Sequence, residues 1–176
     1  LPSSNDLGNG GNLYGGYSSH VIVPHYEYCF DKTGIPDGLA ATYMCAGLTA
    51  FSAMKKVGIP PNGAKDVLVL GLGGVGMQGF QMAKALFGGA PLSADLRQEA
   101  LDVTASQGSM TFNPSDPDVV KKIKQSSPDG TGIFAVVDFV GGDKTFALSS
   151  SIIRRGGIIV QVGLLGGAMS MGLPMF

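Results

Sequence analysis

A glycine cluster at residues 71–76 has the pattern G-x-G-x-x-G, a spacing able to hold a phosphate. It follows four aliphatic residues, 67–70, and precedes a helix-like stretch, 77–87. In such a strand–turn–helix, the first glycine allows the turn, the second lets the backbone approach a pyrophosphate, and the third lets the helix pack closely on the strand. The N–H groups and positive dipole end of the helix would face the phosphates. The pattern predicts a dinucleotide-binding loop, with a purely structural turn as the alternative.

An acidic residue follows the loop at the distance where a carboxylate can bond ribose hydroxyls, roughly 20 residues on. Asp95 lies 19 positions after Gly76 and closes a short extended stretch, 90–94. Arg97 is an alternative contact for an adenosine 2′-phosphate, but Asp95 would repel that phosphate. These residues therefore favour NAD over NADP.

The composition favours a well-packed domain. The chain has 176 residues, of which 44% are hydrophobic and 14% charged, with a net charge of −1. This balance allows a buried core and gives no reason to expect a nucleic-acid or acidic-lipid partner. We expect neither a membrane span nor a signal peptide. Cys29 and Cys45 form no C-x-x-C pair, which favours a reducing, cytoplasmic setting.

Strand-like and helix-like stretches alternate from residue 66 onward, which indicates an α/β fold with a doubly wound parallel sheet. Before them, a short strand at 20–24 and an extended piece at 26–30 are expected. The expected helices are 39–57, 77–87, 97–107, one starting at 115–118, and 144–154, and the expected strands are 66–70, 91–94, 110–113, 133–140 and 157–164.

Ligands of such sheets bind outside the carboxyl ends of the strands, where the strand order reverses. The ends expected here carry the glycine loop, Asp95, residues 113–114, Gly141 and Gly163. Glycine at a strand end suits a flat ligand lying across the edge, but it also simply ends a strand. Both interpretations of Gly141 and Gly163 stay open.

Four segments together carry a family resemblance over nearly the whole chain: 15–24, the C-A-G-x-T segment at 45–49, the stretch from the loop to Asp95, and 138–163. The chain resembles the coenzyme-binding portion of a zinc-type alcohol dehydrogenase of the medium-chain dehydrogenase/reductase family. The resemblance implies a Rossmann NAD-binding domain over 39–176, truncated before the sixth strand. It also implies that 1–38 is a short β remnant of the GroES-like catalytic domain.

The resemblance assigns roles to single residues. Cys45 matches the third protein ligand of the catalytic zinc, and Thr49 matches a residue beside the nicotinamide. Taken alone, Cys45 is better interpreted as a small buried residue, and Thr49 could be only a helix residue that bonds a carbonyl one turn back. The remaining matches are the pyrophosphate loop Gly71, Gly73, Gly74, Val75 and Gly76, the ribose ligand Asp95, and the nicotinamide wall Val140, Gly141, Val162, Gly163 and Leu164.

The implied reaction is hydride transfer between an alcohol, aldehyde or ketone and NAD, with zinc binding the substrate oxygen. The other zinc ligands of the family have no counterpart here. We therefore expect a piece of a longer enzyme that is inactive alone, still binds NAD(H), and belongs to a homodimer or homotetramer. The fifth strand would be an open edge that favours self-association.

Two other functions compete with this one. A zinc-independent NADPH-dependent quinone or enoyl reductase of the same superfamily is disfavoured by the glycine loop and Asp95. The other is a non-catalytic nucleotide-binding protein.

Overall fold

The computed structural model describes residues 19–23, 25–127, 129–164 and 166–168. The chain forms two compact units, Leu1–Ala40 and Ala41–Phe176. In the described part of the first unit, the strand expected at 20–24 is absent, and Tyr26–Tyr28 forms a 3₁₀ helix, η2, in place of an extended piece. The Nδ1 atom of His25 accepts a hydrogen bond from the Glu27 N–H, so local bonds replace strand pairing there. Both expectations were wrong.

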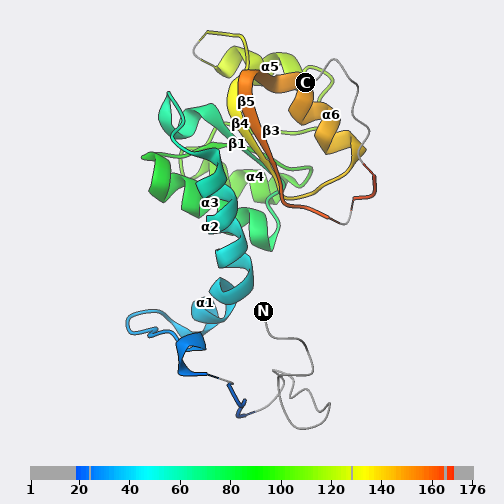
Figure 1. Ribbon diagram of the computed structural model, residues 1–176. Helices are drawn as coiled ribbons and strands as arrows, with labels where there is room; N and C mark the ends of the chain where they lie inside the picture. The colour runs from blue at the N-terminus through cyan, green and yellow to red at the C-terminus, as the bar shows by residue number, and fades with distance from the viewer. Residues whose placement is uncertain (1–18, 24, 128, 165, 169–176) are drawn as a thin grey trace. The chain divides into compact units, whose positions relative to one another are not determined.

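The second unit contains a five-stranded parallel sheet, as predicted (Figure 1). Its order is β3-β2-β1-β4-β5, so β2 and β3 lie on one side of β1 and β4 and β5 on the other. The strand order therefore reverses between β1 and β4, where a Rossmann fold binds its ligand. The strands are β1 (Val67–Leu70), β2 (Leu92–Ala94), β3 (Thr111–Phe112), β4 (Ile133–Asp138) and β5 (Ile153–Gln161).

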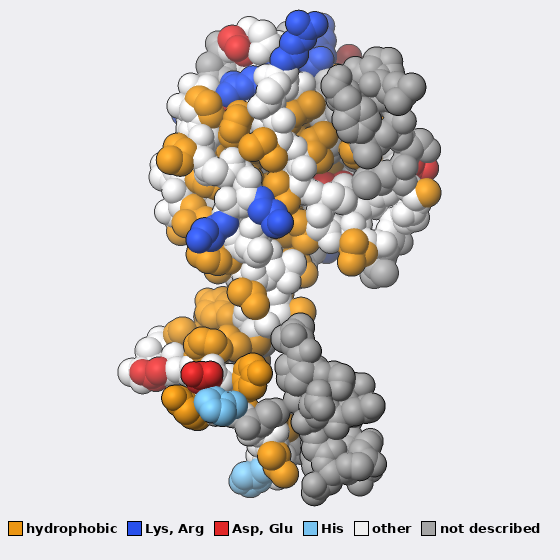
Figure 2. Space-filling model, viewed as in Figure 1, with side chains coloured by type: hydrophobic (Ala, Val, Ile, Leu, Met, Phe, Trp, Pro, Cys, Tyr) orange, Lys and Arg blue, Asp and Glu red, His pale blue; other side chains and the backbone are white. Residues whose placement is uncertain are grey.

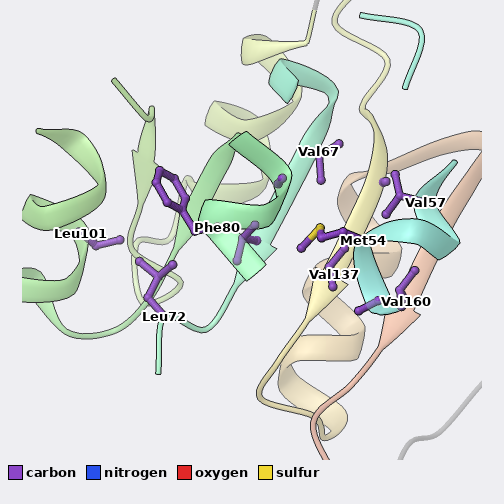
Figure 3. Close-up of a cluster of buried hydrophobic side chains, with 12 residues drawn as sticks. Met54, Val57, Val67, Leu72, Phe80, Leu101, Val137 and Val160 are labelled. Atoms are coloured by element: carbon purple, nitrogen blue, oxygen red, sulfur yellow. The ribbon is translucent and has the colours of Figure 1, made fainter. Parts of the chain in front are cut away.

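Both faces of the sheet are covered, which is why β1 is buried at every position. Val67 and Val69 join a cluster with Phe80 of α3 and Met54 of α2 (Figure 3), while Leu68 joins a second cluster on the opposite face. None of the helices in the described part of the chain is long and apolar enough to cross a membrane. The α-helices of this unit after residue 47 are α2 (Leu48–Val57), α3 (Gly74–Phe87), α4 (Gln98–Ala105), α5 (Val119–Ser126) and α6 (Asp143–Ile152), and a 3₁₀ helix, η4 (Gly63–Asp66), leads into β1.

The helix expected over 39–57 is divided into three pieces. Helix α1 (Asp37–Thr42) leads into a π-helical turn, η3 (Tyr43–Gly47), and α2 follows. The helix ends at Gly58 as predicted, because φ is +73° there and the Gly58 N–H bonds the Lys55 carbonyl. A π-helical turn inserted in an α-helix often marks a functional position.

A buried ion pair joins the starts of three strands. The Asp66 side chain is fully buried, and its Oδ2 atom lies 3.2 Å from Nη2 of Arg154. Asp66 also accepts hydrogen bonds from the Asn62 amide at 2.8 Å and from the Phe134 N–H at 3.3 Å. The sequence predicted Arg154 at the end of a helix, but β5 begins at Ile153 and includes it. The early start reflects an irregularity in the pairing of β4 with β5, between Ile133 and Ala135.

Candidate functional site

The glycine loop follows β1 and closes tightly on itself. Gly71 has a φ of +87°, and a Cβ atom there would lie 2.4 Å from Cγ2 of Val140. A Cβ atom on Gly76 would lie 1.7 Å from the Gly71 carbonyl oxygen. Glycine is therefore required at position 71 by the left-handed backbone and the nearby Val140, and at position 76 by the close contact between the loop and the first turn of α3.

The outer side of the same loop is open. Gly73 and Gly74 are exposed, and a Cβ atom on either would meet no atom within 4 Å. Helix α3 begins at Gly74 without a side-chain cap. N–H groups at an uncapped helix start, with space in front of them, suit an anion such as a pyrophosphate.

Asp95 follows β2 and reaches back to this loop. Its Oδ2 atom accepts a hydrogen bond from the Leu72 N–H at 2.6 Å, and its Oδ1 atom accepts one from the Arg97 N–H at 2.8 Å. The Arg97 guanidinium bonds both carboxylate oxygens, through Nε at 3.1 Å and Nη2 at 3.2 Å. The same Nη2 donates to the Leu72 carbonyl at 3.1 Å. Asp95 and Arg97 together satisfy both backbone polar groups of Leu72, the residue between the first two glycines.

These contacts control the charge of Asp95. Burial raises the pKa of the carboxyl, but hydrogen bonds from the Arg97 side chain, the Arg97 N–H and the Leu72 N–H outweigh it, so the pKa lies below its ordinary value. Asp95 is therefore ionised at neutral pH and able to accept hydrogen bonds.

We expect Asp95→Asn to lower the free energy of unfolding by about 1.5–3 kcal/mol at pH 7, the usual contribution of hydrogen bonds to a charged group. Because the pKa is lowered on folding, this contribution is complete above the unfolded value of about 3.9 and is lost as the pH falls through the folded value. Urea unfolding at pH 7, 5, 4 and 3 measures it. Asp102→Asn, at an exposed position on α4, is the control; a gap between wild type and Asp95→Asn that stays constant down to pH 3 would contradict the prediction.

A hollow of about 560 Å³ joins the loops that follow β1, β2 and β4. It brings together Gly71, Asp95, Arg97, Pro114 and Val140, all singled out in the sequence, and adds Lys144. This is the edge at which the strand order reverses. The hollow therefore has the place and the polar groups that a nucleotide needs.

The loops after β4 and β5 pack backbone against backbone. A Cβ atom on Gly141 would lie 2.2 Å from the Gly163 carbonyl oxygen, and one on Gly163 would lie 2.1 Å from the Val140 carbonyl carbon. Gly142 and Gly166 meet in the same way, with a Cβ atom on Gly142 placed 2.5 Å from the Gly166 oxygen. Gly141 and Gly163 thus do more than end their strands, because they let the two loops touch.

A second groove, of about 690 Å³, runs between α2 and β5 and is lined by Thr49 and Val162. The structure thus brings together two residues assigned to the nicotinamide end. Leu164 is 86% exposed and lines neither the groove nor the hollow. Figure 2 shows hydrophobic side chains interspersed with Lys and Arg side chains on the visible face of this unit. The exposed hydrophobic residues of α2 and α3 include Leu48 and Leu86.

Cys45 lies in the π-helical turn η3 and is exposed, so the interpretation of Cys45 as a small buried residue was wrong. Among the described residues, no three His, Cys, Asp or Glu side chains come together as a metal site. A catalytic zinc takes three protein ligands. The described residues therefore do not form a zinc site, and Cys45 is a single candidate donor.

The sequence did not predict two contacts near the site, those of Arg97 and of Asp138. Arg97 was weighed only as a phosphate ligand, and its bonds to Asp95 and Leu72 were missed, although the D-x-R spacing is a possible signal. Asp138 was placed inside a strand, but β4 ends there because its Oδ1 atom accepts hydrogen bonds from the Val140 and Gly141 N–H groups. An aspartate just before glycines at the end of an apolar run is the signal for such a turn.

The parallel sheet, its flanking helices and the glycine loop define this unit as an α/β domain of the Rossmann type. Residues 74–176 match the family model described as zinc-binding dehydrogenase. The chain belongs to the zinc-binding dehydrogenase family.

Relatives of known name support the same placement. The chain is 32% identical over 166 residues to an NAD-dependent alcohol dehydrogenase of Sulfurisphaera tokodaii, covering 93% of this chain and 47% of that protein. It is equally similar, with the same coverage, to an NAD-dependent alcohol dehydrogenase of Saccharolobus solfataricus. The solved structure of the alcohol dehydrogenase TADH from Thermus sp. ATN1 matches with a TM-score of 0.65 and 26% identity, over 73% of this chain and 37% of that one. The chain thus spans about half the length of the curated relatives it matches.

Proposed function

We propose that this chain is the NAD(H)-binding part of a zinc-dependent alcohol dehydrogenase. The observation that carries the proposal is the ionised Asp95 beside the open glycine loop in one hollow. A carboxylate there accepts hydrogen bonds from ribose hydroxyls, while the start of α3 faces the pyrophosphate. The two NAD-dependent relatives support the choice of coenzyme.

In this proposal the chain binds and orients the coenzyme. Gly71, Gly73, Gly74, Val75 and Gly76 form the pyrophosphate cradle, and Asp95 holds the adenosine ribose. Thr49, Val140, Gly141, Val162 and Gly163 line the nicotinamide half, and the exposed Leu164 follows them directly in the chain. The bound coenzyme supplies the hydride acceptor, and the protein excludes water and fixes the geometry around it.

The zinc-dependent reaction belongs to the proposal for the whole enzyme. Cys45 would supply one thiolate, and because no three candidate ligands come together among the described residues, at least one further protein ligand would have to come from outside the described part. We propose residues 1–38 as part of a catalytic domain and 39–176 as the coenzyme domain. A small alcohol or carbonyl substrate, a homodimeric or homotetrameric assembly and a cytoplasmic location complete the proposal.

The test is NADH binding to the 176-residue chain, measured by the fluorescence of NADH. We expect saturable binding with a dissociation constant within about 1 μM–1 mM, the usual range for enzyme ligands. Asp95→Asn is expected to weaken binding at least about fivefold, the effect of losing one charge-assisted contact, and the exposed Asp102→Asn to leave it unchanged.

We expect no alcohol oxidation by this chain alone, even with added zinc. A folded chain that binds no NADH, or that binds it equally well with Asn at position 95, would overturn the proposed function.

A further inference from the structure

The Asp95 carboxylate has its hydrogen-bonding capacity filled from within the chain. A carboxylate offers about four lone-pair sites. Four bonds from described residues reach it: the Leu72 N–H and Arg97 Nη2 on Oδ2, and the Arg97 N–H and Arg97 Nε on Oδ1. The ribose hydroxyls of a coenzyme need acceptor sites on the same two oxygens. Some of these bonds must therefore be given up when a coenzyme binds.

The four bonds are not equally easy to release. The Leu72 N–H belongs to the glycine loop, and the Arg97 N–H belongs to the backbone just before α4, so moving either would distort the site. The guanidinium is held only at the end of a flexible side chain, which is 58% exposed, against 10% for the Asp95 side chain. The guanidinium can turn into solvent without moving the backbone, although it then gives up its bonds to Asp95 and to the Leu72 carbonyl. The Arg97 side chain is therefore the donor that a coenzyme displaces most easily.

We propose that Arg97 is a specificity-determining residue that exchanges partners when coenzyme binds. In the free chain its guanidinium covers Asp95, and NAD(H) displaces it to reach the carboxylate. The released guanidinium stays at the rim of the hollow, where it can bond a 2′-phosphate. Arg97 thus reduces the discrimination between NAD(H) and NADP(H) from both sides: it competes with the first and attracts the second. This inference rests on the proposed coenzyme site.

The test compares NADH and NADPH binding to the wild-type chain and to Arg97→Gln. Removing the guanidinium frees two acceptor sites on Asp95. We therefore expect NADH to bind about two- to fivefold more tightly, the gain expected when the coenzyme no longer has to displace an Arg side chain that is largely exposed. NADPH should bind at least about fivefold more weakly, because its phosphate then meets Asp95 without the neighbouring Arg97 guanidinium, leaving Lys144 as the other cation named in the hollow. Arg155→Gln removes an exposed cation of β5 and is the control, with both affinities unchanged.

The opposite direction of the two changes separates this role from a structural one. If Arg97 only held the Leu72 carbonyl and the glycine loop, Arg97→Gln would weaken both coenzymes together, and that result would overturn the inference. Unchanged affinities would overturn it as well. Failure of the wild-type chain to bind either coenzyme would instead overturn the proposed function. Thermal unfolding of each variant shows that the comparison is made on folded protein.

Discussion

Gly76→Ala is expected to lower the free energy of unfolding by at least about 3 kcal/mol and to abolish NADH binding. The added methyl group would lie 1.7 Å from the Gly71 carbonyl oxygen, a backbone atom that cannot move without opening the turn. Alanine within α3 gains about 1 kcal/mol of helix propensity over glycine, which does not offset the clash. Urea unfolding and NADH fluorescence measure the two effects.

Gly73→Ala is the matched variant, because it adds the same methyl group to the same loop. At Gly73 φ is −68°, and the methyl group would meet no atom of the chain within 4 Å. The stability should therefore change by less than about 0.5 kcal/mol. If a pyrophosphate approaches this backbone, the methyl group occupies its space, and NADH affinity should fall at least about tenfold. Normal NADH binding by Gly73→Ala would place the phosphates elsewhere.

Arg154→Met is expected to destabilise the chain by about 3 kcal/mol, the lower end of the cost of breaking a buried ion pair. The Arg154 side chain is 18% exposed, whereas Asp66 is fully buried and would be left, among the described residues, with the Asn62 amide and the Phe134 N–H as its hydrogen-bond donors. Because methionine retains most of the aliphatic part of the arginine side chain, the loss of stability measures the contribution of the guanidinium group. Denaturant unfolding at neutral pH measures the change.

The neighbouring Arg155 is exposed and allows the same substitution to be made as a control. Arg155→Met should alter the stability by no more than about 0.5 kcal/mol. Equal effects of the two substitutions would show that the ion pair with Asp66 contributes little to stability.

The central part of the fold could be predicted because local rules and tertiary packing agree there. The aliphatic run that forms β1 is buried on both faces, and the glycine cluster has one favourable conformation between strand and helix. The strands expected near the two ends of the chain were less predictable. Strand β5 starts at Ile153 because of its pairing with β4, and no pattern within residues 153–157 shows that pairing. Residues 19–23 have strand-like composition but no described partner strand.

The candidate site likewise has contacts that the sequence predicts and contacts that only the structure reveals. The position of Asp95 follows from its distance to the loop along the sequence, a relation that the fold imposes. The bond from Arg97 to the Leu72 carbonyl depends on two segments 25 residues apart coming together, so only the structure reveals it. Thr49 and Val162 lie in one groove, but no spacing rule relates α2 to β5, and their pairing rested on family resemblance alone.

The four glycines that join the loops after β4 and β5 have a thermodynamic consequence. Because Gly141, Gly142, Gly163 and Gly166 let the two loops interlock through backbone atoms, neither loop can shift without separating from the other. Ordering of loops and side chains is among the main entropic costs of binding a ligand. Here the entropy of these two loops is already lost when the chain folds, before a coenzyme binds. A coenzyme lying along these loops would meet a wall that is already rigid, and its binding should show a correspondingly small entropic penalty.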